Sequence, residues 1–199
     1  LLPEDTLRKM PDADYVVVGE GENTFPELLR AIEEEGNAGE VPGVASMEDG
    51  EAKFAPSREL IENLDDLPIP RREVLPEHSS YLKIGALNLH AVRGCPYKCA
   101  FCQPTLNRLF GKKIRAKSPE KVADEVRWTV KKYGVRELFF VDDVFTVSRP
   151  WLRRVAEAVK GNGDIGKVRF IVNSRVDIFD EEVARILKEM GADIVLFGV

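Results

Sequence analysis

The feature that most constrains this 199-residue chain is its cysteines, because all three of them lie in one short segment. Cys95, Cys99 and Cys102 follow the spacing C-x3-C-x2-C, directly after the apolar run 87–92. Thiolates this close together converge on one metal centre. Closed zinc and iron–sulfur sites use four protein ligands, so three cysteines leave a coordination position for a ligand that the protein does not supply.

Two other interpretations of the cysteines stay open. With His90 they would form a Cys3His zinc site, or they are unrelated core residues. Structural zinc sites usually pair two C-x2-C segments far apart in sequence, and this chain has only one such segment. The odd cysteine count and the lack of a signal peptide disfavour a disulfide framework and predict a reducing, cytoplasmic location.

Composition predicts a soluble globular protein, with 44% hydrophobic residues, 32% charged residues and a net charge of -5. The longest apolar stretches, 138–141 and 194–197, are far shorter than the roughly 20 residues that a bilayer-spanning helix needs. The acidic balance disfavours nucleic acid as a partner. We interpret the basic residues between 108 and 117 as a solvated loop or a contact to a small anion.

Downstream of the cysteines, short apolar runs alternate with amphipathic segments, which is typical of a parallel sheet with crossover helices. Strands are expected at 87–92, 138–141, 168–172 and 194–197. Three helices are expected between them. Their start and stop signals are Ser118 with Gly134, Ser148 with Gly161, and Asp180 with Gly191.

The amino-terminal part has a different pattern. A strand at 15–18 precedes Gly19-Glu20-Gly21-Glu22 and a helix whose Thr24 and Glu27 have the spacing of a capping box, with Gly36 as its end. A turn is expected at 48–50, followed by a Pro-rich segment at 64–71. Glycines before a helix permit a tight turn or a close approach of the backbone to a ligand.

Polar residues follow two of the expected strands, where parallel α/β folds bind their ligands. Asp142 and Asp143 come after the second strand, and Asn173 and Arg175 come after the third. A purely structural interpretation is also open for the residues after each strand. The aspartates can cap the following turn, and Arg175 can form an ion pair with Asp177.

The cysteine segment resembles the cluster motif of radical S-adenosylmethionine (SAM) enzymes, which have an aromatic residue before the last cysteine, here Phe101. The resemblance implies that Cys95, Cys99 and Cys102 hold a four-iron four-sulfur cluster whose fourth iron is chelated by SAM. In that family the reduced cluster cleaves SAM, and the deoxyadenosyl radical abstracts hydrogen from the substrate. Phe101 is then expected to contact the adenine.

The resemblance also implies roles for the residues after the strands. Val141-Asp142-Asp143 takes the place of the Gly-Gly-Glu segment that serves the SAM amino group in that family. Either aspartate is expected to accept hydrogen bonds from the ammonium. Arg175 is expected to pair with the SAM carboxylate or an anionic substrate group, and Asn173 to contact the ribose.

The amino-terminal pattern resembles the junction between a cobalamin-binding domain and a radical SAM barrel. This implies an α/β fold in three parts: a C-terminal remnant of a Rossmann-like cobalamin-binding domain at 1–40, a hairpin and Pro-rich linker at 41–85, and the N-terminal part of a partial (β/α)6 TIM-like barrel at 86–199. Gly19 and Gly21 would lie near the cobalamin. The chain would then be a fragment of a longer protein.

The resemblance predicts a radical SAM enzyme that performs cobalamin-dependent methylation, or ring formation or rearrangement. The substrate is a small molecule, lipid, tetrapyrrole or peptide, and the electron donor is a flavodoxin or ferredoxin. No catalytic residue is assigned. Two alternatives are a radical SAM methylthiotransferase acting on tRNA or protein, and a zinc-stabilised interaction domain without catalysis.

Overall fold

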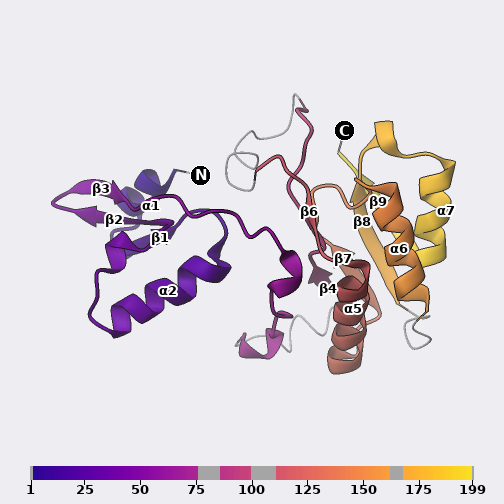
Figure 1. Cartoon of the computed structure of the whole chain (residues 1–199), viewed down its shortest axis with the longest axis horizontal. Coiled ribbons are helices and arrows are strands. Elements are labelled where there is room, and N and C mark those ends of the chain that lie inside the picture. Colours follow the sequence, from indigo (N-terminus) through magenta and orange to yellow (C-terminus); the bar gives the residue numbers. More distant parts are fainter. Residues whose placement is uncertain (1, 76–85, 100–110, 162–167, 199) are drawn as a thin grey trace. The chain divides into compact units, whose positions relative to one another are not determined.

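The computed structural model describes residues 2–75, 86–99, 111–161 and 168–198. The chain divides into two compact units (Figure 1). The smaller unit comprises Leu1–Glu62 with Pro96–Lys113, and the larger comprises Asn63–Cys95 with Ile114–Val199. The assignment of residues 1–40, 41–85 and 86–199 to three functional parts stays a prediction.

The smaller unit contains an antiparallel three-stranded sheet in the order β1-β2-β3. Its elements are α1 (Pro3–Lys9), β1 (Tyr15–Val17), α2 (Gly21–Glu33), η1 (Ala38–Glu40), β2 (Val44–Glu48) and β3 (Glu51–Phe54). The turn predicted at 48–50 joins β2 to β3. Asp49 and Gly50 there have φ values of 50° and 80°, the left-handed conformation that tight hairpin turns require.

The predicted capping box is wrong, because α2 begins at Gly21 and Thr24 lies inside the helix. Thr24 is fully buried, and its hydroxyl donates to the carbonyl of Pro42 at 3.3 Å. Glu27 accepts a hydrogen bond from Arg58 instead of from the start of the helix. Thr24 and Glu27 have the spacing of a capping box, but the helix starts about one turn earlier, with Glu20 at the N-cap position.

The larger unit is built on a parallel sheet in the order β4-β7-β8-β9, as the alternating pattern predicted. The strands are β4 (Ala86–Leu89), β7 (Glu137–Phe140), β8 (Arg169–Ser174) and β9 (Ala192–Phe197). The helices that follow β4, β7 and β8 are α5 (Pro119–Tyr133), α6 (Arg149–Lys160) and α7 (Glu181–Met190). The unit also contains the short η2 (Leu64–Asp66), η3 (Arg72–Val74) and η5 (Val176–Ile178).

The helix boundaries follow the predicted signals. Ser118 accepts a hydrogen bond from the amide of Lys121 at 3.1 Å, and Asp180 caps α7 by accepting from Val183 at 3.0 Å. Gly134 and Gly191, with φ values of 66° and 96°, end α5 and α7 in the left-handed conformation that glycine adopts readily.

The strand expected at 87–92 is two strands, which corrects the sequence prediction. The chain leaves the parallel sheet after Leu89, and β5 (Val92–Arg93) pairs antiparallel with β6 (Arg115–Ala116). At the junction, the carbonyl of Ala91 accepts from the amide of Lys117 at 2.9 Å. Hydropathy alone could not show this break, because it does not reveal that Ala91 and Val92 bond outside the parallel sheet.

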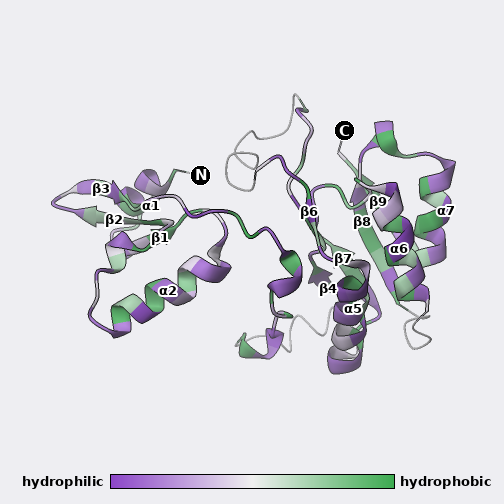
Figure 2. Cartoon of the chain, viewed as in Figure 1, coloured by the Kyte–Doolittle hydropathy of each residue, from purple (hydrophilic) through white to green (hydrophobic). Residues whose placement is uncertain are grey.

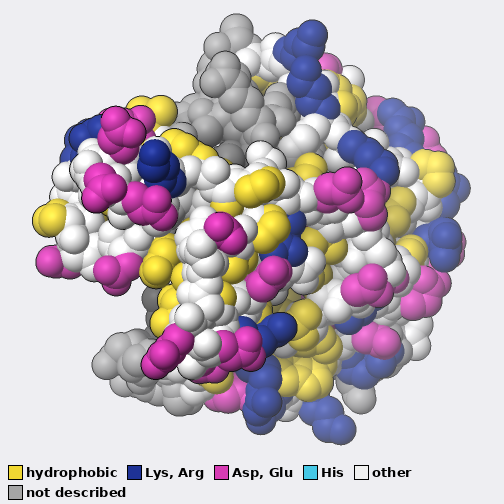
Figure 3. Space-filling model, turned by 60° about the vertical axis from the view of Figure 1, so that its left-hand side comes forward, with side chains coloured by type: hydrophobic (Ala, Val, Ile, Leu, Met, Phe, Trp, Pro, Cys, Tyr) yellow, Lys and Arg dark blue, Asp and Glu magenta, His cyan; other side chains and the backbone are white. Residues whose placement is uncertain are grey.

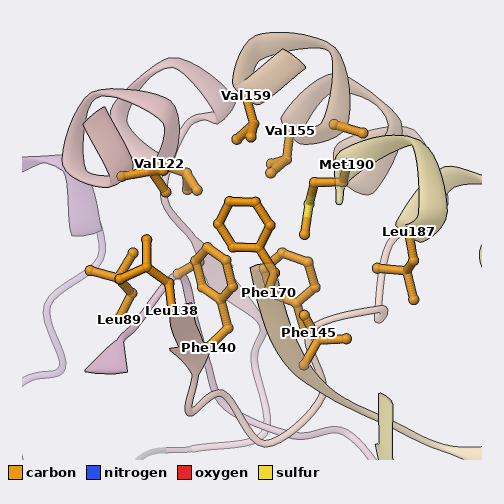
Figure 4. Packing of buried hydrophobic residues seen from close by; sticks show 14 of the residues in the cluster. Leu89, Val122, Leu138, Phe140, Phe145, Val155, Val159, Phe170, Leu187 and Met190 are labelled. Atoms are coloured by element: carbon orange, nitrogen blue, oxygen red, sulfur yellow. The ribbon is translucent and has the colours of Figure 1, made fainter. Parts of the chain in front are cut away.

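The core of the larger unit lies between the sheet and its three helices, which cover one face of the sheet (Figure 4). Phe140 is at the centre, with ring centroids 4.5 Å from Phe145 and 5.8 Å from Phe170. Figure 2 shows β8 as hydrophobic and α6 and α7 as mixed, as expected for helices with one buried side. On the other sheet face, Phe139 and Ile171 remain half-buried.

A buried ion pair lies beside β6. Lys117 and Glu125, 6% and 2% exposed, approach each other with 2.7 Å between Nζ and each carboxylate oxygen. The carbonyl of Lys117 also accepts from the indole nitrogen of Trp151 at 2.7 Å. These contacts fix β6, and through it the junction at Ala91.

Candidate functional site at the carboxyl ends of the strands

The parallel sheet brings the predicted polar residues to one edge. Strands β4, β7 and β8 are neighbours and run in the same direction, so their carboxyl ends meet there. His90 directly follows β4, Asp142 and Asp143 follow β7, and Asn173 and Arg175 lie at the end of β8. Four of these five were expected from the sequence as ligand-binding residues, and His90 only as a zinc ligand.

Asp142 is completely buried and organises the junction between β4 and β5. Its Oδ1 accepts from the amides of Ala91 at 2.8 Å and Val92 at 3.0 Å, and lies 2.9 Å from Nδ1 of His90. Its Oδ2 has no hydrogen-bond partner among the described residues. The structure therefore gives Asp142 a role in the fold that the sequence interpretation did not assign, and its role toward SAM stays a prediction.

Asp143, unlike Asp142, is exposed at the surface. The surrounding protein removes water from the carboxylate and so raises the pKa of Asp143 above its usual range, and the charge of Asp142 adds to this effect. His90 acts in the opposite direction. Of the two aspartates, Asp143 is the better placed to accept hydrogen bonds from a ligand.

Asn173 fastens the end of β8 to the loop after β7. Its side-chain amide donates to the carbonyl of Asp142 at 2.9 Å, and its own carbonyl accepts from the amide of Phe145 at 3.0 Å. The hydroxyls of Thr146 and Ser174, both buried, are 2.7 Å apart in the same region. The ribose contact expected for Asn173 stays a prediction beside this structural role.

Arg175 forms the ion pair with Asp177 that the sequence analysis considered as its structural interpretation. Its Nε and Nη2 lie 2.9 and 2.6 Å from the two carboxylate oxygens of Asp177. These hydrogen bonds lower the pKa of Asp177. The guanidinium is thus held at the end of β8, with its side chain 24% exposed.

The cysteine segment begins two residues after β5. Gly94, with a φ of 88°, turns the chain before Cys95. Cys95 and Cys99 are partly buried and not in a disulfide. Phe101 and Cys102 lie outside the described residues, and the ligand roles of the three cysteines stay predictions.

The smaller unit has a pocket of about 270 Å³ next to the predicted Gly-Glu-Gly-Glu segment. It is lined in part by Gly19, Glu20, Gly43 and Arg58. Gly19 has a φ of 88°, whereas Gly21 is the first residue of α2, and a Cβ there would lie an ordinary 3.8 Å from Val17. The conformation that favours glycine is therefore at Gly19 and not at Gly21. Gly43, which also lines the pocket, has a φ of 86°.

In the part of the chain that the structure describes, none of the helices is long and apolar enough to cross a bilayer. On the face drawn in Figure 3, basic and acidic side chains are interspersed and form no continuous basic surface.

Comparison with known proteins agrees with this architecture. The chain is 37% identical over 201 residues to an uncharacterised methyltransferase, PH0819, of Pyrococcus horikoshii, covering 99% of this chain and 42% of that protein. It is 31% identical to the hopanoid C-3 methylase of Methylococcus capsulatus, covering 94% of this chain and 35% of that protein. The chain thus spans less than half the length of these relatives.

A solved structure shares the fold. It is the radical SAM methyltransferase TsrM of Kitasatospora setae with cobalamin and a [4Fe-4S] cluster bound, with a TM-score of 0.80 and 21% identity, covering 98% of this chain and 40% of that one. Residues 90–199, more than half of the chain and including all three cysteines, match the sequence profile of the radical SAM superfamily. The chain belongs to the radical SAM superfamily, whose members use a [4Fe-4S] cluster and SAM.

Proposed function

We propose that this chain is part of a cobalamin-dependent radical SAM methyltransferase. The observation that carries the proposal is the C-x3-C-x2-C segment, which starts two residues after β5. The chain just before it is anchored, because the amides of Ala91 and Val92 donate to Asp142 at the carboxyl edge of the sheet. Membership of the family favours an enzyme over a zinc-stabilised interaction domain.

The chain's own residues have separate tasks in this proposal. Cys95, Cys99 and Cys102 hold the cluster, which supplies the electron for the cleavage of SAM. Asp143 accepts hydrogen bonds from the ammonium of SAM, and Asp142 fixes the strand junction that precedes the cysteines. Arg175 binds the SAM carboxylate, which requires it to share its guanidinium with Asp177.

Cobalamin binding is supported by the pocket at Gly19 and by the cobalamin found in the structurally similar TsrM. Gly19 and Gly43 have a left-handed backbone and no side chain, so at these two positions the main chain itself lines the pocket. We place the nucleotide end of cobalamin, which is the polar part of the molecule, near Gly19.

We favour methylation over ring formation because the two relatives with the higher identities, 37% and 31%, are described as methyltransferase or methylase. An anaerobic magnesium-protoporphyrin IX monomethyl ester cyclase of Synechocystis is also similar, at 27% identity, and keeps ring formation as the alternative. We place the reaction in the cytoplasm, where the three thiols stay reduced. The substrate is a small molecule, lipid, tetrapyrrole or peptide, and the reductant a flavodoxin or ferredoxin.

The test is SAM turnover by the whole protein that contains this chain, loaded anaerobically with iron, sulfide and cobalamin and reduced with dithionite. With methyl-labelled SAM we expect 5′-deoxyadenosine and label on bound cobalamin. Gly19→Ala should lower cobalamin content several-fold because the left-handed conformation is costly for alanine. Gly21→Ala, the matched control, should not.

Iron content should be the same in both glycine variants. A wild-type protein that takes up iron but no cobalamin would replace this proposal with a cobalamin-independent radical SAM enzyme. A protein that takes up neither and holds zinc would overturn the whole assignment.

A further inference from the structure

Of the five residues described at the carboxyl ends of the strands, His90 is the one to which no role toward SAM has been assigned. It follows β4, and its side chain is 40% exposed while that of its partner Asp142 is 0% exposed. Nδ1 of the ring lies 2.9 Å from Oδ1 of Asp142. One ring nitrogen is thus turned toward a buried carboxylate, and the rest of the ring extends toward the surface.

The contact with Asp142 fixes where the ring carries its proton. Oδ1 already accepts from the amides of Ala91 and Val92, and an ionised carboxylate has no hydrogen to donate. Nδ1 must therefore carry the proton that faces Oδ1. In the neutral ring the lone pair is then on Nε2, the nitrogen on the other side.

In this neutral form Nε2 is an acceptor, and it has no hydrogen-bond partner among the described residues. Within the described part of the chain, the carboxylates of Asp142 and Asp143 interact with the ring. A ligand that fits beside these acceptors has to bring an N–H or O–H group of its own.

We propose that Nε2 of His90 accepts a hydrogen bond from an N–H or O–H group of SAM, and that Asp142 is the positioning residue that fixes the ring for this contact. The inference rests on the proposed function only in taking SAM as the ligand. It adds a SAM-binding residue directly after β4, outside the cysteine segment and outside the aspartate pair.

The first test is the tautomer of His90, measured by ¹⁵N NMR of the whole protein without cofactors. A His90→Gln variant, which loses one imidazole signal, identifies the signal of His90 among those of the whole protein. We expect the proton of neutral His90 on Nδ1, and a shift toward the Nε2–H form in Asp142→Asn, which keeps an acceptor oxygen for the two amides but loses the charge. An Nε2–H tautomer in the wild type would overturn the proposal.

The second test uses two substitutions that each mimic one ring nitrogen. His90→Asn keeps a donor near the position of Nδ1 and loses Nε2, whereas His90→Gln places an amide oxygen near the position of Nε2. With the cluster loaded, we expect SAM binding, measured by equilibrium dialysis, to weaken about tenfold in His90→Asn and much less in His90→Gln.

A purely structural role for His90 gives the opposite order, with His90→Asn the milder change. That order, or an unchanged SAM affinity in both variants, would overturn the inference while leaving the proposed function intact. A wild-type protein that holds its cluster but binds no SAM would instead overturn the proposed function as well.

Discussion

Strands β7 and β8 are neighbours in one sheet, yet the charged residues at their carboxyl ends differ in nearly every respect. Asp142 after β7 is fully buried and holds two backbone amides and His90. Arg175 after β8 is partly exposed and forms an ion pair with the exposed side chain of Asp177. A strand-end position thus predicts where a polar residue lies, but burial decides whether it also holds the fold.

The region around β5 and β6 should lose the most stability when it is disrupted. Glu125→Ala leaves the ammonium of Lys117 buried without its carboxylate, so we expect the free energy of unfolding to fall by about 3–5 kcal/mol. Urea denaturation measures this. A double variant, Lys117→Met with Glu125→Leu, should recover most of the loss, and failure to recover it would mean that more than the charge pair is involved.

Asp142→Ala should have the next largest effect, because it leaves the buried amides of Ala91 and Val92 without their acceptor. We expect a loss of about 3 kcal/mol in the free energy of unfolding. Asp142→Asn, which retains an acceptor oxygen, should lose less than half of that. Equal losses in the two variants would show that the negative charge, and not the hydrogen bonds, holds the junction.

Arg175→Ala should separate binding from folding. The ion pair with Asp177 is partly exposed, so we expect only a small change in the free energy of unfolding. SAM affinity should fall roughly tenfold or more if Arg175 binds the carboxylate. Asp177→Asn is the matched control, because it weakens this ion pair, keeps Arg175 and should not weaken SAM binding. An unchanged SAM affinity in Arg175→Ala would leave Arg175 as a surface ion pair only.

The smallest expected effect is a difference in pH dependence between Asp143 and Asp177. The pKa of Asp177 is below its usual value of 3.8, so its contribution to stability is present above that pH and is lost as the pH falls through the lower value. The pKa of Asp143 is above 3.8, so its contribution is present below that pH and is lost as the pH rises through the higher value. Carboxyl ¹³C titration should give the higher midpoint to Asp143, and the reverse order would contradict the described environments.

The sequence predicted the parallel sheet and its helices because the apolar periods and the caps at Ser118 and Asp180 are local signals. It also placed Asp142, Asp143, Asn173 and Arg175 at the ends of the right strands. It could not show that Oδ1 of Asp142 binds residues 91 and 92, because that contact joins segments some fifty residues apart. The same contact explains why the strand expected at 87–92 is broken.

The amino-terminal helix was harder to predict for a similar reason. Thr24 and Glu27 have the spacing of a cap, but their partners are Pro42 and Arg58, which only the folded chain brings close. The choice between Gly19 and Gly21 needed backbone dihedral angles, because a Gly-x-Gly pattern does not say which glycine has a positive φ. Local sequence patterns do not predict hydrogen-bond partners that are distant in sequence, or the φ value of a particular glycine.

The most direct test of the account is the iron and acid-labile sulfide content of the whole protein after anaerobic reconstitution, together with that of Cys95→Ala, Cys99→Ala and Cys102→Ala. We predict about four irons and four sulfides per chain in the wild type, with electron paramagnetic resonance of a reduced [4Fe-4S] cluster that changes when SAM is added. Each single variant should lose the intact cluster and SAM cleavage. A variant that kept full iron content and cleaved SAM, or a wild type that held stoichiometric zinc instead of iron, would contradict the assignment of these three cysteines.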